Sequence, residues 1–254
     1  MDIKILIAAH KKYWLPDDPV YFPLQVGAEG KNGLGITKDD SGDNISNKNP
    51  YFCELTGLYW AWKNLSCDYI GLCHYRRYFA HNGIYTSPEK MKRLILKQED
   101  YVDIFKNYDI ILPPKHRIRD KTVKEQYAKS HNVRDLDEAI KIIIEKYPDY
   151  EDTVNSFFHQ SEIYYYNMFA MKKCYFDNYC SWIFDILFTL EQTIDISSYD
   201  AHQSRVYGFL AERLFNVWIN QQDLKIKNVP VVFLEEKKRS LWVNTKRYFS
   251  QMCL

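Results

Sequence analysis

Three short apolar segments, separated by amphipathic helical patterns, constrain the fold of this chain more than any other feature of its sequence. They span residues 2–10, 68–74 and 109–113, and basic residues or proline follow each of them closely. Nearly continuous apolar runs of this length are typical of strands that are buried on both faces of a parallel sheet. Similar segments at 164–171 and 225–234 supply two further predicted strands.

Helical patterns with recognisable start signals lie between these segments. Asn49 can cap the first helix, Pro50 suits its first turn, and the pattern ends near Asn64. Its predicted buried stripe, which leaves Trp60 pointing elsewhere, consists of Leu55, Leu58, Tyr59 and Trp62. Further helices are predicted at residues 88–106, 122–130, 135–147, 149–163, 176–194 and 200–221.

The order of these elements predicts the fold class. Strands that alternate with helices favour an α/β fold with a mostly parallel central sheet flanked by helices. No Pro/Gly/Ser-rich linker divides the chain, so we expect residues 1–254 to form a single domain.

Residues 13–48 are polar, rich in glycine, aspartate and asparagine, and without helical periodicity. We expect a long loop there, part of which folds over a bound ligand, because long loops in compact domains are usually functional or mobile. Asp39, Asp40 and Asp43 form an acidic cluster within it. Such a cluster can bind a divalent cation, but a solvated loop is the better interpretation.

The composition limits the function classes. A formal net charge of +1 gives no whole-protein electrostatic case for nucleic-acid binding, so we expect no nucleic-acid partner. The six cysteines form no C-x-x-C pair or zinc spacing and are interpreted as reduced thiols of a cytoplasmic protein. No segment matches G-x-G-x-x-G, the P-loop or G-x-S-x-G, which disfavours dinucleotide-binding, P-loop and serine-hydrolase functions.

Basic residues follow two of the predicted strands. His10 and Lys11 follow the first, and His74, Arg76 and Arg77 follow the second. Ligands of open α/β sheets gather at the carboxyl ends of strands, and arginine matches phosphate geometry through paired hydrogen bonds. We therefore expect a phosphate or nucleotide site there, with a structural salt bridge as the alternative for the arginines and a solvated loop for His10 and Lys11.

Two carboxylates near the last long helix are candidate bases. Glu212 lies in an otherwise apolar stretch, where a raised pKa would suit a general base, and Asp200 lies at the start of the predicted helix. An ion pair with Arg205 or Arg213 is the alternative for Glu212.

The C-terminal segment, about residues 237–254, combines lysine and arginine with aromatic residues and has no acidic residue. This pattern suits peripheral contact with an anionic membrane surface. An ordinary frayed tail is the alternative.

Taken in order along nearly the whole chain, several segments resemble a bacterial glycosyltransferase family that was first catalogued as a domain of unknown function and later recognised as galactofuranosyltransferases of capsule, exopolysaccharide and O-antigen synthesis. The matching segments are Ala9-His-Lys11, Asp43-Asn-Ile-Ser46 with Lys48-Asn49, Cys53-Glu-Leu-Thr56 with Tyr59-Trp-Ala-Trp-Lys-Asn64, Gly71-Leu-Cys-His-Tyr-Arg-Arg-Tyr-Phe79, Asp109-Ile-Ile-Leu-Pro113, Asn167-Met-Phe169, and Arg205 with Gly208-Phe-Leu-Ala-Glu-Arg-Leu214.

The resemblance implies a GT-A-like fold, a UDP-linked donor expected to be UDP-galactofuranose, and a glycan acceptor carried on a lipid diphosphate. The cysteines and the basic–aromatic tail lead us to expect a cytoplasmic protein whose tail contacts the inner face of the cell membrane. A UDP-hexopyranose (galactose or glucose) transferase of the same fold, and a noncatalytic nucleotide- or glycan-binding module, are the alternatives.

The expected site residues follow from the resemblance together with the strand ends. The donor side comprises His10, Lys11, Asn44, Asn49, Glu54, His74, Arg76 and Arg77. The acceptor side comprises His131, His159 and Asn167. The two histidines each begin or end a predicted helix, and a structural cap is the alternative for either. For an inverting single displacement, Glu212 is the first choice of base and Asp200 the second.

Metal dependence is the remaining expectation. His74-Tyr-Arg76 stands where many GT-A enzymes carry an Asp-x-Asp metal motif. We therefore expect basic side chains to stabilise the departing UDP, without an essential Mg²⁺ or Mn²⁺.

Overall fold

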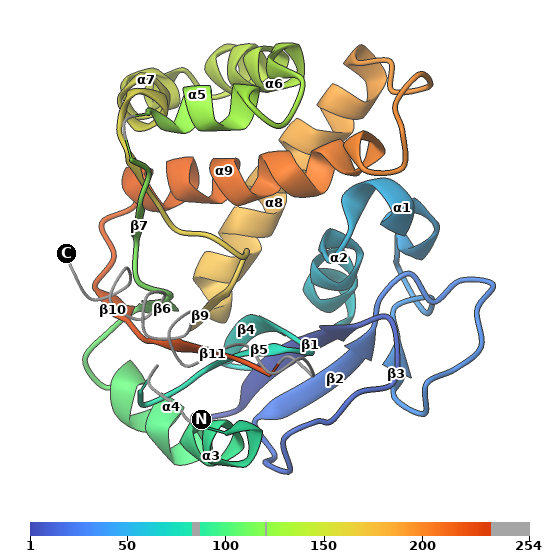
Figure 1. Cartoon of the computed structure of the whole chain (residues 1–254), viewed down its shortest axis with the longest axis vertical. Helices are drawn as coiled ribbons and strands as arrows, with labels where there is room; N and C mark the ends of the chain where they lie inside the picture. Colours follow the sequence, from blue (N-terminus) through green and yellow to red (C-terminus); the bar gives the residue numbers. More distant parts are fainter. Residues whose placement is uncertain (83–86, 120, 235–254) are drawn as a thin grey trace.

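A mixed sheet forms the centre of the computed structural model, which describes residues 1–82, 87–119 and 121–234 (Figure 1). The strand order along the sheet is β10-β6-β9-β4-β1-β2-β3, with β5 and β11 paired beside β4. The strands are β1 (Ile3–Ala9), β2 (Tyr21–Gln25), β3 (Thr37–Lys38), β4 (Tyr69–His74), β5 (Arg77–Phe79), β6 (Ile110–Leu112), β9 (Phe169–Lys172), β10 (Ile226–Asn228) and β11 (Val231–Phe233).

The predicted α/β fold with a mostly parallel sheet is confirmed. β1 pairs in parallel with both β2 and β4, and β2–β3 and β10–β6 are also parallel. The antiparallel pairs are those of β9 with both of its neighbours, β4 and β6, and those of β5 with β4 and β11. The carboxyl ends of β1 and β4 therefore lie at one edge of the sheet, together with the residues that lead into β9.

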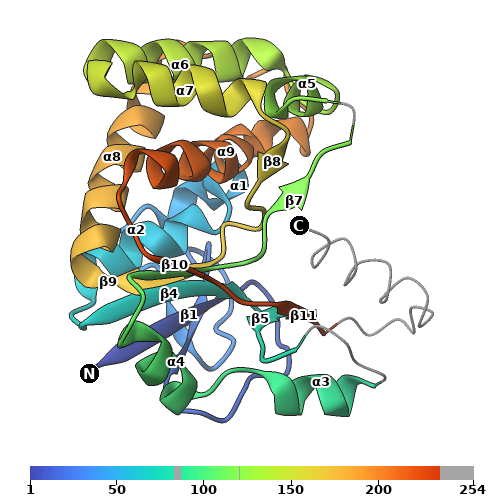
Figure 2. The same cartoon turned by 90° about the vertical axis from the view of Figure 1, so that its left-hand side faces the viewer.

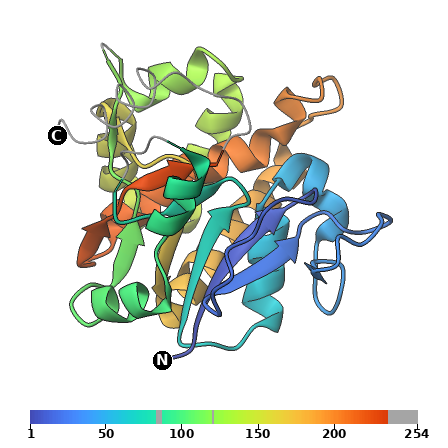
Figure 3. The same cartoon turned by 60° about the horizontal axis from the view of Figure 1, so that its bottom comes forward.

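Helices cover both faces of this sheet (Figures 1 and 2). On one face lie α1 (Asn49–Phe52), α2 (Leu55–Asn64), α8 (Lys173–Thr193) and α9 (Val206–Gln221). Beyond α9 lie α5 (Val123–Ala128), α6 (Val133–Lys146) and α7 (Glu151–His159). The opposite face carries α3 (Pro88–Leu94) and α4 (Gln98–Phe105), which come forward in Figure 3. Short elements complete the chain: β7 (His116–Arg117), β8 (Glu162–Ile163) and the 3₁₀ turns η1 (Ser46–Lys48), η2 (Pro148–Tyr150) and η3 (Gln203–Arg205).

The side chains of β1 point alternately to the two faces of the sheet, and so belong to two layers of the core. Leu6 and Ala8 belong to the larger apolar cluster, which lies under α2, α8 and α9. Ile5 and Ile7 belong to the second cluster, on the side of α3 and α4. Both faces of β1 are thus buried, as the continuous apolar run predicted.

Several predicted boundaries are wrong. Residues 13–48 are not simply a loop, since they contribute β2 and β3. The predicted helix 88–106 is two helices, α3 and α4, and 225–234 is two strands, β10 and β11. The strand predicted at 164–171 begins only at Phe169. Trp60 was expected to point away from the core but is 5% exposed, because it stacks on Phe22 of β2.

The helix predicted from Asn49 to Asn64 is interrupted at Cys53, which has a φ of 54°. Asn49 lies within α1 and not at its cap position, and its amide donates to Cys53 O at 2.7 Å and to Thr56 Oγ1 at 3.2 Å. The amide therefore bridges the interruption between α1 and α2.

The acidic cluster is not simply a solvated loop, because Asp39 is fully buried. Its carboxylate accepts hydrogen bonds from Gly27 N, Ala28 N and the hydroxyls of Ser46 and Thr56. The predicted basic–aromatic tail, residues 237–254, lies outside the described residues. Within the described residues, no helix combines the length and apolar character that crossing a bilayer requires.

Candidate functional site

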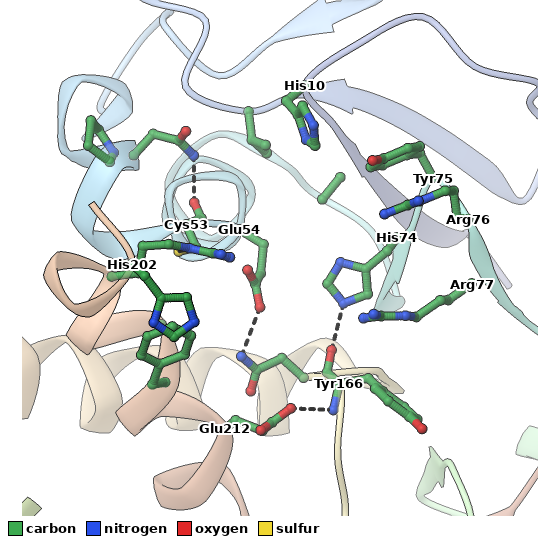
Figure 4. Close-up of a pocket in the computed structure, with 18 of the residues that line it drawn as sticks. His10, Cys53, Glu54, His74, Tyr75, Arg76, Arg77, Tyr166, His202 and Glu212 are labelled. Atoms are coloured by element: carbon green, nitrogen blue, oxygen red, sulfur yellow. Dashed lines mark hydrogen bonds between the residues drawn. The ribbon is translucent and has the colours of Figure 1, made fainter. Parts of the chain in front are cut away.

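A cavity of about 840 Å³ opens at the carboxyl ends of β1 and β4 (Figure 4). Its walls come from segments far apart in the sequence: the ends of β1 and β4, the α1–α2 junction, the segment before β9, the residues after α5 and the first half of α9. Apolar contacts bring α9 close to the α1–α2 junction. A Cβ on Gly208 would lie 3.0 Å from Cys53 Sγ, so glycine permits this approach.

Basic and aromatic side chains line the strand-end wall. The rings of His10 and Tyr75 meet edge to face at 5.1 Å, and the Arg76 guanidinium lies 5.0 Å from the centre of the Tyr75 ring. Partial burial lowers the pKa of His10, and the nearby charges of Lys11 and Arg76 lower it further. A concave wall with this charge favours an anionic ligand.

His74, at the end of β4, is held by a backbone group. Its Nε2 lies 2.6 Å from the carbonyl oxygen of Tyr166. A carbonyl oxygen only accepts hydrogen bonds, so Nε2 carries the proton. Burial lowers the pKa of His74, an effect that Glu54 opposes and Arg77 reinforces. Near neutral pH the imidazole is therefore neutral, and Nδ1 is its available acceptor.

Glu54 follows the left-handed Cys53 and lines the cavity. Asn167 Nδ2 donates to its Oε1 at 2.9 Å. Among the described residues, no side chain or backbone group donates to its Oε2. Glu54 thus has one carboxylate oxygen open to a ligand.

Glu212, on α9, has both oxygens engaged. Its Oε1 accepts from Tyr166 N at 2.6 Å, and its Oε2 lies 2.7 Å from Arg213 Nη1. The ion pair with Arg213 that the sequence left open is therefore present. Burial raises the pKa of Glu212, whereas Arg213 and the Tyr166 N–H act in the opposite direction.

Tyr166 and Asn167 form a left-handed turn between these groups. Their φ values are 83° and 50°, and a non-glycine residue in this region costs on the order of 1–3 kcal/mol. Strained residues of this kind cluster at functional sites, where the surrounding structure holds them in place.

Rings form the rim on the α9 side. Phe209 lies 4.1 Å from the His131 ring and 5.1 Å from the His202 ring, measured between centroids. Arg205 lies over the same phenyl ring at 5.5 Å and donates from Nε to Cys53 Sγ at 3.1 Å. An apolar surface with polar edges suits the faces of sugars or of a base.

Most residues that the sequence singled out lie in this cavity. Nine of them line it: His10, Asn49, Glu54, His74, Arg76, Arg77, His131, Asn167 and Glu212.

Four predicted residues do not line the cavity: Lys11, Asn44, His159 and Asp200. Lys11 lies beside it, with Nζ 5.7 Å from the Tyr75 ring. Asn44 and Asp200 both accept hydrogen bonds from nearby backbone N–H groups. The bonds to the Asp200 carboxylate lower its pKa. His159 Nδ1 lies 2.7 Å from Asn155 O, one turn earlier in α7.

The sequence analysis assigned no site role to several residues that line the cavity: Cys53, Tyr75, Tyr166, His202, Arg205 and Phe209. Tyr75 had a local signal, its position between His74 and Arg76, and Cys53, Arg205 and Phe209 lie in segments that carry the family resemblance. Within the part of the chain that the structure describes, no group of three or more His, Cys, Asp or Glu side chains is arranged to hold a metal ion.

Comparisons with known proteins agree with this fold. A family model described as Domain of unknown function (DUF4422) matches residues 4–223. The solved apo structure of WbbM, described as a bifunctional glycosyltransferase, is 34% identical in sequence and superimposes with a TM-score of 0.88. The match covers 93% of this chain and 46% of WbbM, so the chain spans about half the length of that protein. No curated protein sequence matches.

Proposed function

The chain belongs to the DUF4422 family, and we propose on that premise that it is a glycosyltransferase that moves a sugar from a UDP-linked donor to a glycan acceptor. One observation carries the proposal. The basic side chains at the ends of β1 and β4 line the same cavity as Glu54, and Oε2 of Glu54 is open to a ligand. Charge that develops on a leaving diphosphate and a proton that leaves an acceptor hydroxyl need these two kinds of group. The likeness to WbbM, which is described as a bifunctional glycosyltransferase, supports the same reaction class.

The donor that we propose is UDP-galactofuranose, on the resemblance noted from the sequence. The diphosphate would lie against His10, Arg76 and Arg77, because these side chains combine positive charge with hydrogen-bond donors on the wall of the cavity. The acceptor would enter from the rim formed by His131, His202 and Phe209, where rings can cover the apolar face of a sugar. We propose a lipid-linked glycan as this acceptor, with the reaction in the cytoplasm and the tail of residues 237–254 at the membrane.

For an inverting displacement, one carboxylate must take the proton of the attacking hydroxyl. The sequence favoured Glu212, but both of its oxygens already accept hydrogen bonds. Asp200 does not line the cavity. Glu54 lines it and keeps Oε2 open, so we propose Glu54 as the base. Replacement by glutamine should reduce turnover by about 10²–10⁴-fold while UDP binding is retained.

We propose that the basic side chains reduce the need for a divalent metal at the diphosphate. Turnover should then be the same in EDTA as in Mn²⁺ or Mg²⁺. Activity that EDTA abolishes and either metal restores would contradict this proposal.

The reaction itself is tested by incubating the protein with UDP-galactofuranose or UDP-galactopyranose and a panel of lipid-linked glycan mimics, and by following UDP release and product mass. Transfer from the furanose donor alone supports the whole proposal. Transfer from the pyranose donor keeps the reaction class and overturns the donor. A noncatalytic binding module would show UDP-induced thermal stabilisation without turnover. Hydrolysis of the donor, which needs no glycan acceptor, distinguishes it from an enzyme that was given the wrong acceptor.

A further inference from the structure

The left-handed turn at Tyr166 and Asn167 is held on three sides by groups of the cavity (Figure 4). Tyr166 N donates to Glu212 Oε1, and Tyr166 O accepts from His74 Nε2, each at 2.6 Å. The Asn167 amide donates to Glu54 at 2.9 Å. Two consecutive residues with positive φ need such support, because the conformation is unfavourable for side chains other than glycine.

The support from α9 extends along the segment that leads to this turn. Asn216, one helical turn after Glu212, accepts from Tyr164 N at 2.7 Å and donates to Tyr164 O at 2.9 Å. Glu212 and Asn216 thus bind the backbone of Tyr166 and of Tyr164, in the same segment. Together they fix its distance from the helix.

The Glu212 carboxylate takes part in holding this segment in place through one of its oxygens. Its second oxygen pairs with Arg213, which is 5% exposed and also donates to Gln126 Oε1 at 3.0 Å. To act as a base, Glu212 would have to take up a proton on an oxygen that already accepts a charge-assisted hydrogen bond, which lowers its basicity. Figure 4 shows Tyr166 between Glu212 on one side and His74 on the other.

We propose that Glu212 is a positioning residue: through the Tyr166–Asn167 turn it fixes the orientation of His74 and Glu54 toward the cavity. The inference rests on the proposed function, since turnover is one of its readouts. It assigns the direct contact with substrate to His74 and Glu54.

The experiment compares Glu212→Gln with Glu212→Ala, because an amide oxygen can still accept from Tyr166 N and a methyl group cannot. Displacement of reacting groups by about 1 Å costs on the order of 10²-fold in rate, so we expect this loss in turnover for Glu212→Ala. Glutamine should recover most of it. Glu145→Ala, which removes an exposed carboxylate of α6, is the matched control and should behave as wild type.

A second readout is independent of turnover. In protein labelled with ¹⁵N-histidine, the His74 resonance, assigned with His74→Gln, should report a proton fixed on Nε2. Glu212→Ala should lose that signature and Glu212→Gln should keep it. Because alanine leaves Arg213 without its carboxylate, Glu212→Ala/Arg213→Met is made in parallel, so that a folding defect of the single variant does not decide the result.

Two results would overturn the inference. One is an unchanged His74 resonance in the alanine variants. The other is a Glu212→Gln protein that retains the His74 signature but is as inactive as Glu212→Ala, which would make Glu212 the base. Wild-type protein that neither binds UDP in calorimetry nor turns over would overturn the proposed function alone, since the His74 resonance would still report on the turn.

Discussion

Thr56 Oγ1 donates a hydrogen bond to Asp39 Oδ2 at 2.7 Å, and this bond joins the residues after β3 to the first turn of α2. Gly27 N and Ala28 N donate to the same carboxylate at 2.8 and 3.0 Å. Because α2 begins directly after Glu54, Asp39 supports the element that carries the proposed base.

Replacing Asp39 by alanine should therefore lower the free energy of unfolding by about 3 kcal/mol or more, because several buried donors lose a charged acceptor. Urea unfolding followed by circular dichroism measures this change. Asp40→Ala is the control. Its partly exposed carboxylate pairs with Lys38, so the loss should be about 0–1 kcal/mol. Equal losses in the two variants would mean that Asp39 has no special structural role.

Arg76 is exposed at the strand-end wall and is available to a diphosphate. Arg76→Ala should weaken UDP binding in calorimetry by about tenfold or more, because a charge-assisted hydrogen bond is worth about 1.5–3 kcal/mol. Arg134→Ala, which removes an exposed arginine at the start of α6, should leave UDP binding unchanged. The diphosphate lies elsewhere if both variants bind UDP as wild type does.

His10 should take up a proton when UDP binds. Its pKa in the free protein lies below the ordinary 6.5, so near that pH the ring is mostly neutral. A nearby diphosphate favours the charged form and raises the pKa, so binding should tighten as the pH falls from 7.5 to 6. The gain is up to about tenfold for each unit of that rise.

Calorimetry in two buffers of different ionisation enthalpy measures this proton uptake. His10→Gln should reduce it, and the comparison removes the contribution of the nucleotide's own phosphate. Identical uptake by the two proteins would place the diphosphate away from His10.

Cys53 offers a probe of the cavity that needs no turnover. Burial raises the pKa of its thiol, with Glu54 adding to the effect and Arg205 opposing it, so the reactive thiolate is scarce near neutral pH. Maleimide should label Cys53 more slowly than the exposed Cys174, and UDP should slow Cys53 further without affecting Cys174. Peptide mass spectrometry separates the two sites. Labelling of Cys53 that UDP leaves unchanged would show that the nucleotide does not cover this wall.

The sequence predicted the elements whose burial is continuous along the chain. β1 and β4 are buried on both faces and therefore appear as uninterrupted apolar runs. β2 was missed because it contains Pro23, which usually argues against a central strand. Its strand character comes from pairing with β1, where Pro23 lies opposite Ile7.

The break between α3 and α4 was missed for a similar reason. Residues 94–97 contain no glycine or proline, so local propensity does not end the helix there. Tertiary contacts end it instead, because Ile95 bridges to Ala80 and Leu96 N donates to Phe79 O at 3.0 Å.

The strand-end half of the site could be predicted, because residues that leave a parallel strand reach the ligand edge whatever the rest of the fold does. The opposite half was predicted only in part, because Asn167 and Glu212 were named but the Tyr166 turn between them and His74 was not. Tyr166 reaches the cavity through bonds to His74 and Glu212, which are separated from it by 92 and 46 positions in the chain. Neither bond leaves a pattern in the residues around Tyr166.

The reversed direction of β9 explains how one cavity collects both halves. Leu72 of β4 pairs with Phe169 of β9, so the chain enters β9 at the edge where it leaves β4. In an all-parallel sheet, every connection at this edge would depart from a strand, and each would be tied to the helix that follows. Here an incoming connection shares the edge with outgoing ones. Under the proposed function, the outgoing connections carry the basic side chains that face the diphosphate, and the incoming one carries Tyr166 and Asn167, which hold His74 and Glu54.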